Sequence, residues 1–112
     1  MISSHVLDTS LGKPAAGVKV SLEKLAPNDG WTQIGWGTTD DDGRVRDLLA
    51  AGARLEEVRY RLVFDTYTYF AARGVEAFYP VVIVVFEISD PNQHYHVPLL
   101  LSPFGYSTYR GS

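Results

Sequence analysis

The sequence contains no cysteine among its 112 residues, which excludes disulfide bonds and thiolate chemistry. It also lacks a surplus of basic residues, since 13 acidic and 10 basic side chains give a formal net charge of −3. A protein dedicated to nucleic-acid binding would carry a basic patch or stripe, so that class is disfavoured. The longest apolar run, from Val81 to Phe86, is far too short to cross a bilayer.

The first ten residues, MISSHVLDTS, have neither a charged n-region nor an apolar core, which predicts that no signal peptide is present. We therefore expect a cytoplasmic protein, with the alternative that an export signal has already been removed. The length of 112 residues predicts a single domain, residues 1–112. A domain of this size buries about two-thirds of its unfolded surface, so its core is modest.

Alternating apolar and polar residues between turn signals are typical of strands. They predict strands at Ile2–Asp8, Gly17–Lys24, Trp31–Thr38, Arg59–Phe64 and Phe78–Ile88. Loops rich in turn formers are expected at residues 8–14, 26–30 and 39–44, and Gly43 is expected to take a positive φ that fixes where Arg44 points. Val45–Glu57 is the least regular part and is expected to hold a short edge strand and a loop. Asp65 or Thr66 is expected to cap a two-turn helix that ends at Gly74.

The last twenty residues predict a hairpin around Ser102–Gly105. The period of two places His94, His96, Pro98 and Leu100 on one face of its first strand. Tyr95, Val97, Leu99 and Leu101 would face the core. On its second strand, alternation separates Ser107, Tyr109 and Gly111 from Thr108, Arg110 and Ser112. With the other segments this gives roughly eight strands and one short helix, the pattern of an all-β sandwich.

Val81 to Phe86 does not alternate, whereas a strand with one solvated face should. Its continuous apolarity suggests that both faces, or one face and an edge, are covered. A second subunit would provide that cover and remove an aggregation hazard. The residues alone leave an alternative of equal weight, a central strand shielded by loops.

The stretch HYHVPLLLSPFGYSTYRGS, residues 94–112, resembles the carboxy-terminal signature of the 5-hydroxyisourate hydrolases, the transthyretin-like proteins. HVLD at residues 5–8 and the glycine–arginine pair at residues 43–44 resemble two further motifs of that family. Together these motifs extend over nearly the whole chain. Transthyretin, the hormone carrier, is similar in the same region but lacks the histidine that follows the tyrosine and the closing YRGS.

The resemblance implies a transthyretin-like (prealbumin-like) eight-stranded β-sandwich with one short helix. It implies a homotetramer in which sandwiches pair edge to edge and two dimers stack around a central channel. The implied reaction opens 5-hydroxyisourate, an oxidised purine formed from urate, to 2-oxo-4-hydroxy-4-carboxy-5-ureidoimidazoline, and it needs no cofactor. Water adds to a ring carbonyl and a C–N bond breaks, which calls for a base, oxyanion donors and an acid.

Four residues match the implied catalytic positions: His5, Arg44, His96 and Ser112. The two histidines would share the proton transfers, with one of them activating water and the choice between them open. Arg44 would hold substrate carbonyls and developing negative charge with its planar fork of donors. Ser112 would orient a histidine or the water through its hydroxyl or, if the chain ends there, its carboxylate.

The closing residues are the expected substrate-binding positions, with Tyr109 walling the pocket, Arg110 anchoring the chain end, and Gly111 between that anchor and Ser112. Arg110 as a plain surface charge is the simpler alternative. His94 is most simply a solvated or subunit-contact residue. Histidines at i and i+2 on a strand can chelate a metal, but without cysteine a zinc site is a minority interpretation. The aspartate run at residues 40–42 lacks the ligand spacing of a calcium loop.

Two functions from other classes remain as alternatives. One is a carrier that binds a hydrophobic, hormone-like aromatic ligand in the tetramer channel. Tyr109 and the polar or charged side chains of Arg44, His96 and Ser112 count against it, because they would narrow the channel and make it polar, whereas such ligand sites are mostly apolar. The other is a purely structural interaction module, which leaves the YRGS end unexplained.

Overall fold

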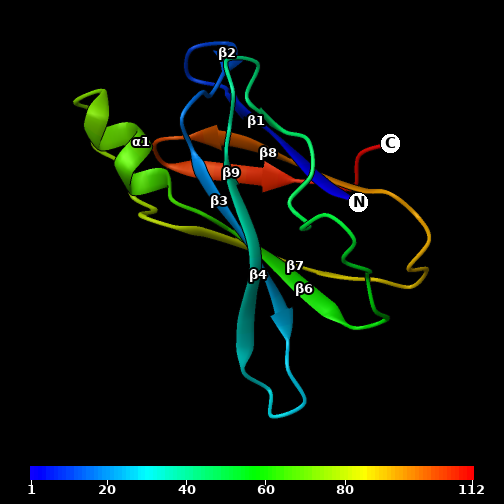
Figure 1. Ribbon diagram of the computed structural model, residues 1–112. Coiled ribbons are helices and arrows are strands. Elements are labelled where there is room, and N and C mark those ends of the chain that lie inside the picture. Colours follow the sequence, from blue (N-terminus) through cyan, green and yellow to red (C-terminus); the bar gives the residue numbers. More distant parts are fainter.

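Two β-sheets pack face to face in the computed structural model, which describes residues 1–112 (Figure 1). The first sheet has the order β2-β1-β8-β9, and β5 also pairs with β1. Its strands are β1 (Ile2–Asp8), β2 (Lys13–Pro14), β5 (Arg44–Val45), β8 (Tyr95–Ser102) and β9 (Gly105–Thr108). β1 and β8 lie at opposite ends of the sequence and pair in parallel, whereas the other pairs are antiparallel.

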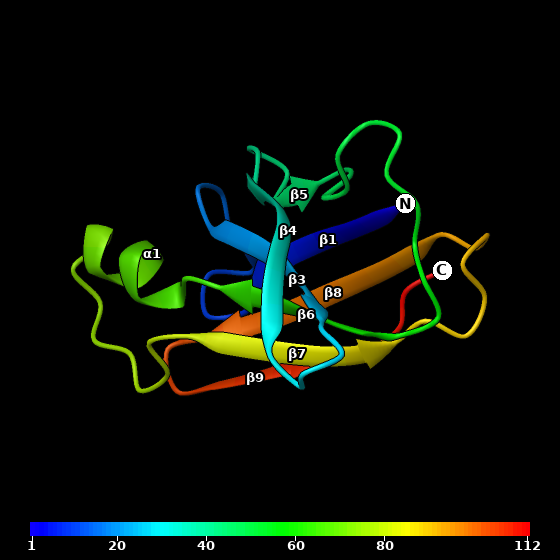
Figure 2. The same cartoon turned by 60° about the horizontal axis from the view of Figure 1, so that its bottom comes forward.

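The second sheet has four antiparallel strands in the order β4-β3-β6-β7. They are β3 (Lys19–Leu25), β4 (Trp31–Thr38), β6 (Arg59–Phe64) and β7 (Val82–Glu87). The all-β sandwich expected from the sequence is thereby confirmed. The two chain ends lie at one end of the sandwich and helix α1 (Thr66–Ala72) lies at the other (Figures 1 and 2).

Between the sheets lies a core of 20 buried apolar residues. The period of two predicted its membership well, because every second residue of a strand points to the same face. The predicted inward faces that are buried include Val18, Val20 and Leu22, then Tyr60, Leu62 and Phe64, and finally Tyr95, Val97, Leu99 and Leu101. Each such side chain contributes roughly 1.5–3 kcal/mol through burial, which holds the two sheets together.

Helix α1 follows β6 directly and begins as the sequence predicts. The Asp65 carboxylate accepts hydrogen bonds from the backbone N–H and the hydroxyl of Thr68, at 3.1 and 2.7 Å. Gly74, with φ of 66°, allows the chain to turn away after the helix. The seven residues of α1 are too few to cross a membrane, and the fold contains no other helix.

Three segments differ from the sequence-based expectation. Lys13–Pro14 pairs with β1 inside a predicted loop, so nine strands are present instead of eight; a ladder of two residues is too short to leave a periodic signal. The predicted Phe78–Ile88 strand is shorter in the structure, where β7 extends only from Val82 to Glu87 and the Phe78 N–H donates to the Pro103 carbonyl outside any ladder. The second strand of the closing hairpin ends at Thr108, and only a single bridge from Gly111 to β8 follows it.

The apolar tract that contains β7 lies on an edge strand, so the alternative of a shielded central strand is wrong. Val82 points inward and is fully buried, whereas Ile83 and Val85 on the opposite face are 43% and 53% exposed. β9 forms an edge of the other sheet and lies on the same side of the sandwich as β7 (Figure 2). Residues of β7 and of the β9 end line one shared groove. A single chain therefore leaves an apolar face and two strand edges uncovered.

Candidate active site

The outward face of the first sheet gathers the polar side chains that the motifs singled out. In the parallel β1–β8 ladder Ser3 is paired with His96, and in the antiparallel β1–β5 ladder His5 is paired with Arg44. Directly paired residues point to the same face of a sheet. Because the neighbouring Ser4 and Val97 are buried in the opposite direction, the paired set faces away from the core.

The turn before β5 determines where Arg44 lies. The Asp40 carboxylate accepts the backbone N–H groups of Asp42 and Arg44 at 2.9 and 3.0 Å, and the Arg44 bond is the main cause of a lowered Asp40 pKa. Gly43 has φ of 75°, as predicted, and a Cβ there would lie 2.4 Å from the Val6 carbonyl. Only glycine fits this close approach, which places Arg44 beside His5.

His5 has a defined tautomer in this arrangement. Its Nε2 lies 2.9 Å from the backbone carbonyl of Asp42. A carbonyl can only accept, so Nε2 must carry the proton, and in the neutral ring the lone pair is on Nδ1. His5 therefore offers Nδ1 as its reactive nitrogen.

His96 is half-buried and, unlike His5, offers Nε2 as its reactive nitrogen. Its Nδ1 lies 2.7 Å from the Ser3 hydroxyl, and Nε2 has no hydrogen-bond partner in the chain. Because no buried side-chain nitrogen or oxygen lacks a partner, Nε2 must be accessible to solvent. Burial lowers the pKa of His96, and the nearby charges of Arg44, His94 and His5 lower it further. A lowered pKa keeps the ring neutral at pH 7, the state that a general base requires.

Gly111 packs against the ring of His96. Its N–H donates to the His96 carbonyl at 2.8 Å, and a Cβ at this position would lie 2.5 Å from His96 Cδ2. Arg110 is held away from this contact, with its guanidinium 4.7 Å from the ring centre of Tyr95 and Nη2 2.8 Å from the Gln93 side-chain oxygen. The closing segment is thus held by Gly111 against the His96 ring and by Arg110 against Tyr95 and Gln93.

An open pocket of about 420 Å³ lies over this face. Its ten lining residues are mostly polar, with Met1 and Val45 the apolar members; the others are Ser3, Ser4, Arg44, Arg46, Asp47, His94, His96 and Ser112. A smaller groove of about 240 Å³ lies between the β7 and β9 edges and includes Tyr109, Arg110 and His96. His96 borders both spaces.

The structure therefore brings the predicted residues together unevenly. Arg44, His96 and Ser112 surround the pocket, and His5 is adjacent through its pairing with Arg44. Tyr109 and Arg110 line the neighbouring groove, and Gly111 contacts His96. No three histidine or carboxylate side chains converge in a way that would hold a metal ion.

Ser3 and His94, which the sequence interpretation did not place in the site, both line the pocket. His94 lines the pocket, and its Nε2 lies 2.8 Å from the hydroxyl of Ser3. The signal for Ser3 was its position two residues before His5 on the same strand, which places both on one face. The signal for His94 was its position two residues before His96.

The aspartate of the HVLD motif has a structural place. Asp8 is buried on the core side of β1 and accepts a 2.7 Å hydrogen bond from the hydroxyl of Tyr69 in α1. Burial would raise the pKa of Asp8, but its hydrogen bonds from Ser10 and Tyr69 outweigh burial and lower it. Burial and the bond to Asp8 raise the pKa of Tyr69 to about 12. Within this motif, His5 faces the site and Asp8 fastens the helix.

Comparison with known proteins agrees with these motifs. The chain matches the HIUase/Transthyretin family over residues 2–111. It belongs to this family. Among its relatives is a probable 5-hydroxyisourate hydrolase of Caenorhabditis elegans, 56% identical over 99% of this chain and 81% of the relative. The 5-hydroxyisourate hydrolases of Salmonella dublin and Mus musculus are 50% and 46% identical, covering 100% and 99% of this chain and 81% and 94% of those proteins.

Solved structures of the family confirm the transthyretin-like sandwich. The 5-hydroxyisourate hydrolase of Klebsiella pneumoniae is 37% identical, with a TM-score of 0.85 over 99% of this chain and 98% of that chain. Sea bream transthyretin in complex with thyroxine is 35% identical, with a TM-score of 0.90 over 98% of this chain and 93% of that chain. Because a hydrolase and a carrier share the fold, the fold alone does not assign the function.

Proposed function

We infer that this chain is a 5-hydroxyisourate hydrolase of urate degradation. The observation that carries this assignment is that relatives named as 5-hydroxyisourate hydrolases are about half identical over essentially the whole chain. The pocket supports it, because neutral histidine, arginine and hydroxyl groups suit the addition of water to a ring carbonyl. Water adds to the carbonyl, an oxyanion forms, and the ring C–N bond opens.

His96 is the general base in our assignment. Its Nε2 is bare and accessible, and its lowered pKa keeps it unprotonated near neutral pH. It takes a proton from water as the water oxygen attacks the carbonyl carbon. His5, held by the Asp42 carbonyl through Nε2, accepts the second proton of the added water on the lone pair of Nδ1 and passes it to the leaving nitrogen as the C–N bond breaks.

Arg44 binds the carbonyl oxygens of the substrate and the oxyanion that forms from one of them. Its side chain makes no ion pair in the structure, so its donors are available to a ligand. A guanidinium presents these donors in a plane, which matches a flat ring that carries several carbonyl groups. Ser112, on the rim of the same pocket, orients the attacking water with its hydroxyl.

We propose that the active form is a homotetramer, a dimer of dimers. The uncovered edges of β7 and β9 and the exposed Ile83 and Val85 support edge-to-edge pairing, because uncovered apolar edges invite association. The open pocket supports stacking of two dimers over the first sheet, which would exclude water from the site. Native mass spectrometry measures this directly, and a monomer at assay concentration would contradict it. A cytoplasmic location stays a prediction.

The test of activity is an ultraviolet time course. Urate oxidase generates 5-hydroxyisourate from urate in the cuvette, and the protein is then added. We expect the absorbance of the intermediate to decay at a rate proportional to the protein concentration. Decay at the uncatalysed rate with folded protein would contradict the assignment. Thyroxine binding would then be measured to test the carrier alternative, which the polar lining of the pocket disfavours.

A further inference from the structure

A single hydroxyl connects two histidines of the site. Ser3 Oγ lies 2.7 Å from His96 Nδ1 and 2.8 Å from His94 Nε2. Ser3 is only 6% exposed, and the two rings stand nearly perpendicular, at 82°, with centres 6.4 Å apart. Both distances are those of good hydrogen bonds, so the three side chains form one chain of hydrogen bonds.

The single proton of the serine hydroxyl restricts how this chain can be arranged. A hydroxyl donates one hydrogen bond, so it can donate to only one of the two ring nitrogens and must accept from the other. If Ser3 donates to His94, then His96 carries its proton on Nδ1 and has a lone pair on Nε2. If Ser3 donates to His96, then Nε2 of His96 carries the proton and cannot act as a base.

We propose that Ser3 and His94 set the protonation of His96, with Ser3 positioning the base and His94 receiving the proton that the base collects. This proposal rests on the assignment of His96 as the base. In the resting site His96 Nδ1 donates to Ser3, and Ser3 donates to His94 Nε2. Nε2 of His96 then has the lone pair that it needs to accept a proton from water.

The proton transfers balance along the chain. As water attacks, its O–H bond breaks and an N–H bond forms at His96 Nε2. The Nδ1 proton of His96 then moves to Ser3 Oγ, and the Ser3 hydroxyl proton moves to His94 Nε2. His96 becomes neutral again with its proton on Nε2, and the positive charge is on His94. After the reaction the chain runs in reverse: His94 returns a proton through Ser3 to His96 Nδ1, and His96 Nε2 gives its proton to water, which restores the starting state.

Burial and charge give this transfer its direction. His96 is half-buried and lies near Arg44 and His5, so a positive charge on its ring is disfavoured. His94 is exposed, and water can solvate a charge there. Moving the charge from His96 to His94 takes it from a poorly solvated ring to a well-solvated one.

The decisive measurement is the tautomer of His96, read from ring ¹⁵N chemical shifts in protein without substrate, above the pH at which His96 titrates. We expect wild type to carry the proton on Nδ1. Ser3→Ala should lose this preference, and Ser3→Thr, which keeps the hydroxyl, should retain it. An unchanged tautomer in Ser3→Ala would overturn the proposal whether or not the protein hydrolyses 5-hydroxyisourate.

His94→Phe tests the other end of the chain and also serves if Ser3→Ala fails to fold. Without an acceptor at residue 94, Ser3 is free to donate to His96 Nδ1, so the His96 proton should shift toward Nε2. Persistence of the Nδ1 proton in this variant would overturn the role of His94. Ser102→Ala is the matched control, because its hydroxyl bonds the Gly105 carbonyl at 3.0 Å at the far end of β8.

Turnover provides a second readout that a purely structural role would not affect. We expect kcat to fall about 10-fold in Ser3→Ala with KM unchanged, a part of the 10²–10⁴-fold worth of a general base. The Ser3→Ala/His94→Phe double variant should be no slower than Ser3→Ala, because both changes interrupt one chain. Added imidazole should partly restore His94→Ala but not Ser3→Ala. Additive losses and no response to imidazole would contradict the relay.

Discussion

The two sheets of the sandwich differ in whether their charged side chains form ion pairs. All three ion pairs of the structure involve the second sheet, namely Lys24–Glu56, Arg59–Glu87 and Arg61–Glu23. On the first sheet, Arg44 and the histidines face a common pocket or its border without any ion pair. The acidic residue of that pocket, Asp47, accepts backbone N–H groups from Ile2 and Leu49.

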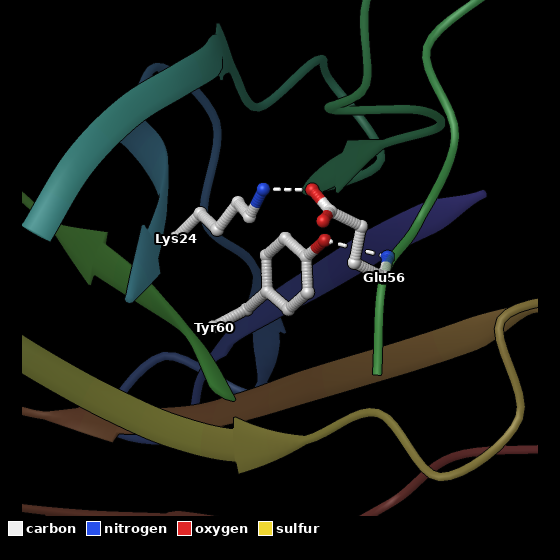
Figure 3. A network of polar contacts seen from close by, with 3 residues as sticks. All are labelled: Lys24, Glu56 and Tyr60. Atoms are coloured by element: carbon white, nitrogen blue, oxygen red, sulfur yellow. Dashed lines mark hydrogen bonds and ion pairs between the residues drawn. The ribbon is translucent and has the colours of Figure 1, made fainter. Parts of the chain in front are cut away.

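On the second sheet, charged groups serve to fix local structure. Figure 3 shows Lys24 bonded to the carboxylate of Glu56, while the backbone N–H of Glu56 donates to the Tyr60 hydroxyl at 2.9 Å. These contacts fasten the loop before β6 to the sheet. Arg61 likewise bonds Glu23 at 2.6 Å and stacks on Trp31, with 4.5 Å from guanidinium to ring centre.

This difference between the two sheets indicates which face of the sandwich carries the reactive groups. Holding several cationic or titratable groups together without an ion pair costs stability, so their persistence on one face indicates that a ligand completes them. In an ion pair the donors and acceptors already bond each other, so they are not available to a ligand. The comparison predicts that substitutions on the first sheet reduce turnover with little loss of stability, and that those on the second sheet do the reverse.

The largest effect is expected for His96→Asn. Removing the general base should lower kcat by about 10²–10⁴-fold, because asparagine cannot accept the proton of water. The ultraviolet assay measures the loss, and native mass spectrometry checks that the assembly is unchanged. Near-native turnover in an intact assembly would show that His96 is not the base.

Arg44→Ala is expected to lower kcat by about 10²–10³-fold, the usual cost of removing an oxyanion donor. Thermal unfolding should show no loss of stability, because the Arg44 side chain has no ion pair to lose. A large fall in melting temperature would break the contrast between the sheets, since it would mean that Arg44 also fastens the fold.

Gly111→Ala tests the contact that holds the His96 ring. The added Cβ would lie 2.5 Å from Cδ2 of that ring, so either the ring or the closing segment must move. A displacement of about 1 Å can cost up to 10²-fold in rate, and we expect kcat to fall 10- to 100-fold. Gly105→Ala is the control, since its Cβ would meet only the Ser102 hydroxyl at 3.7 Å.

The titration of His96 sharpens the comparison further. Burial, aided by Arg44, holds its pKa below 6.5, so activity should persist below the pH at which a free histidine is protonated. Arg44→Ala should move the His96 pKa upward, as measured by NMR titration. Because the native state binds fewer protons there, the free energy of unfolding should fall as pH drops from about 6.5 through the folded pKa. An unchanged His96 pKa in Arg44→Ala would show that the Arg44 charge does not act on the His96 ring.

The smallest effect is expected on the second sheet, for Arg61→Ala. Losing the partly buried bond to Glu23 and the stacking on Trp31 should lower the free energy of unfolding by about 0.5–1 kcal/mol. Urea unfolding measures this loss. kcat should stay within twofold of wild type, and a strong fall in kcat with an intact assembly would mean that the second sheet also contributes to catalysis.

Local pattern was sufficient for most strands and for the orientation of their side chains. It placed Ile2–Asp8, Trp31–Thr38 and Arg59–Phe64 with the bounds that the structure has. It also predicted the positive φ of Gly43, because few residues other than glycine tolerate such a turn. It failed at Lys13–Pro14, where pairing with β1 decides the conformation and two residues carry no period.

The sequence by itself determined the two-sheet class, the inward faces and the motifs that identify the family, because these depend on neighbours along the chain. Only the tertiary structure decided that Ser3 meets His94 and His96 and that Tyr109 borders a groove apart from Arg44. Those contacts depend on the register of β1 against β8, strands from opposite ends of the sequence. The alternation within each strand fixes which face points inward, but which residue of β1 meets which residue of β8 is decided only when both strands pack over one core.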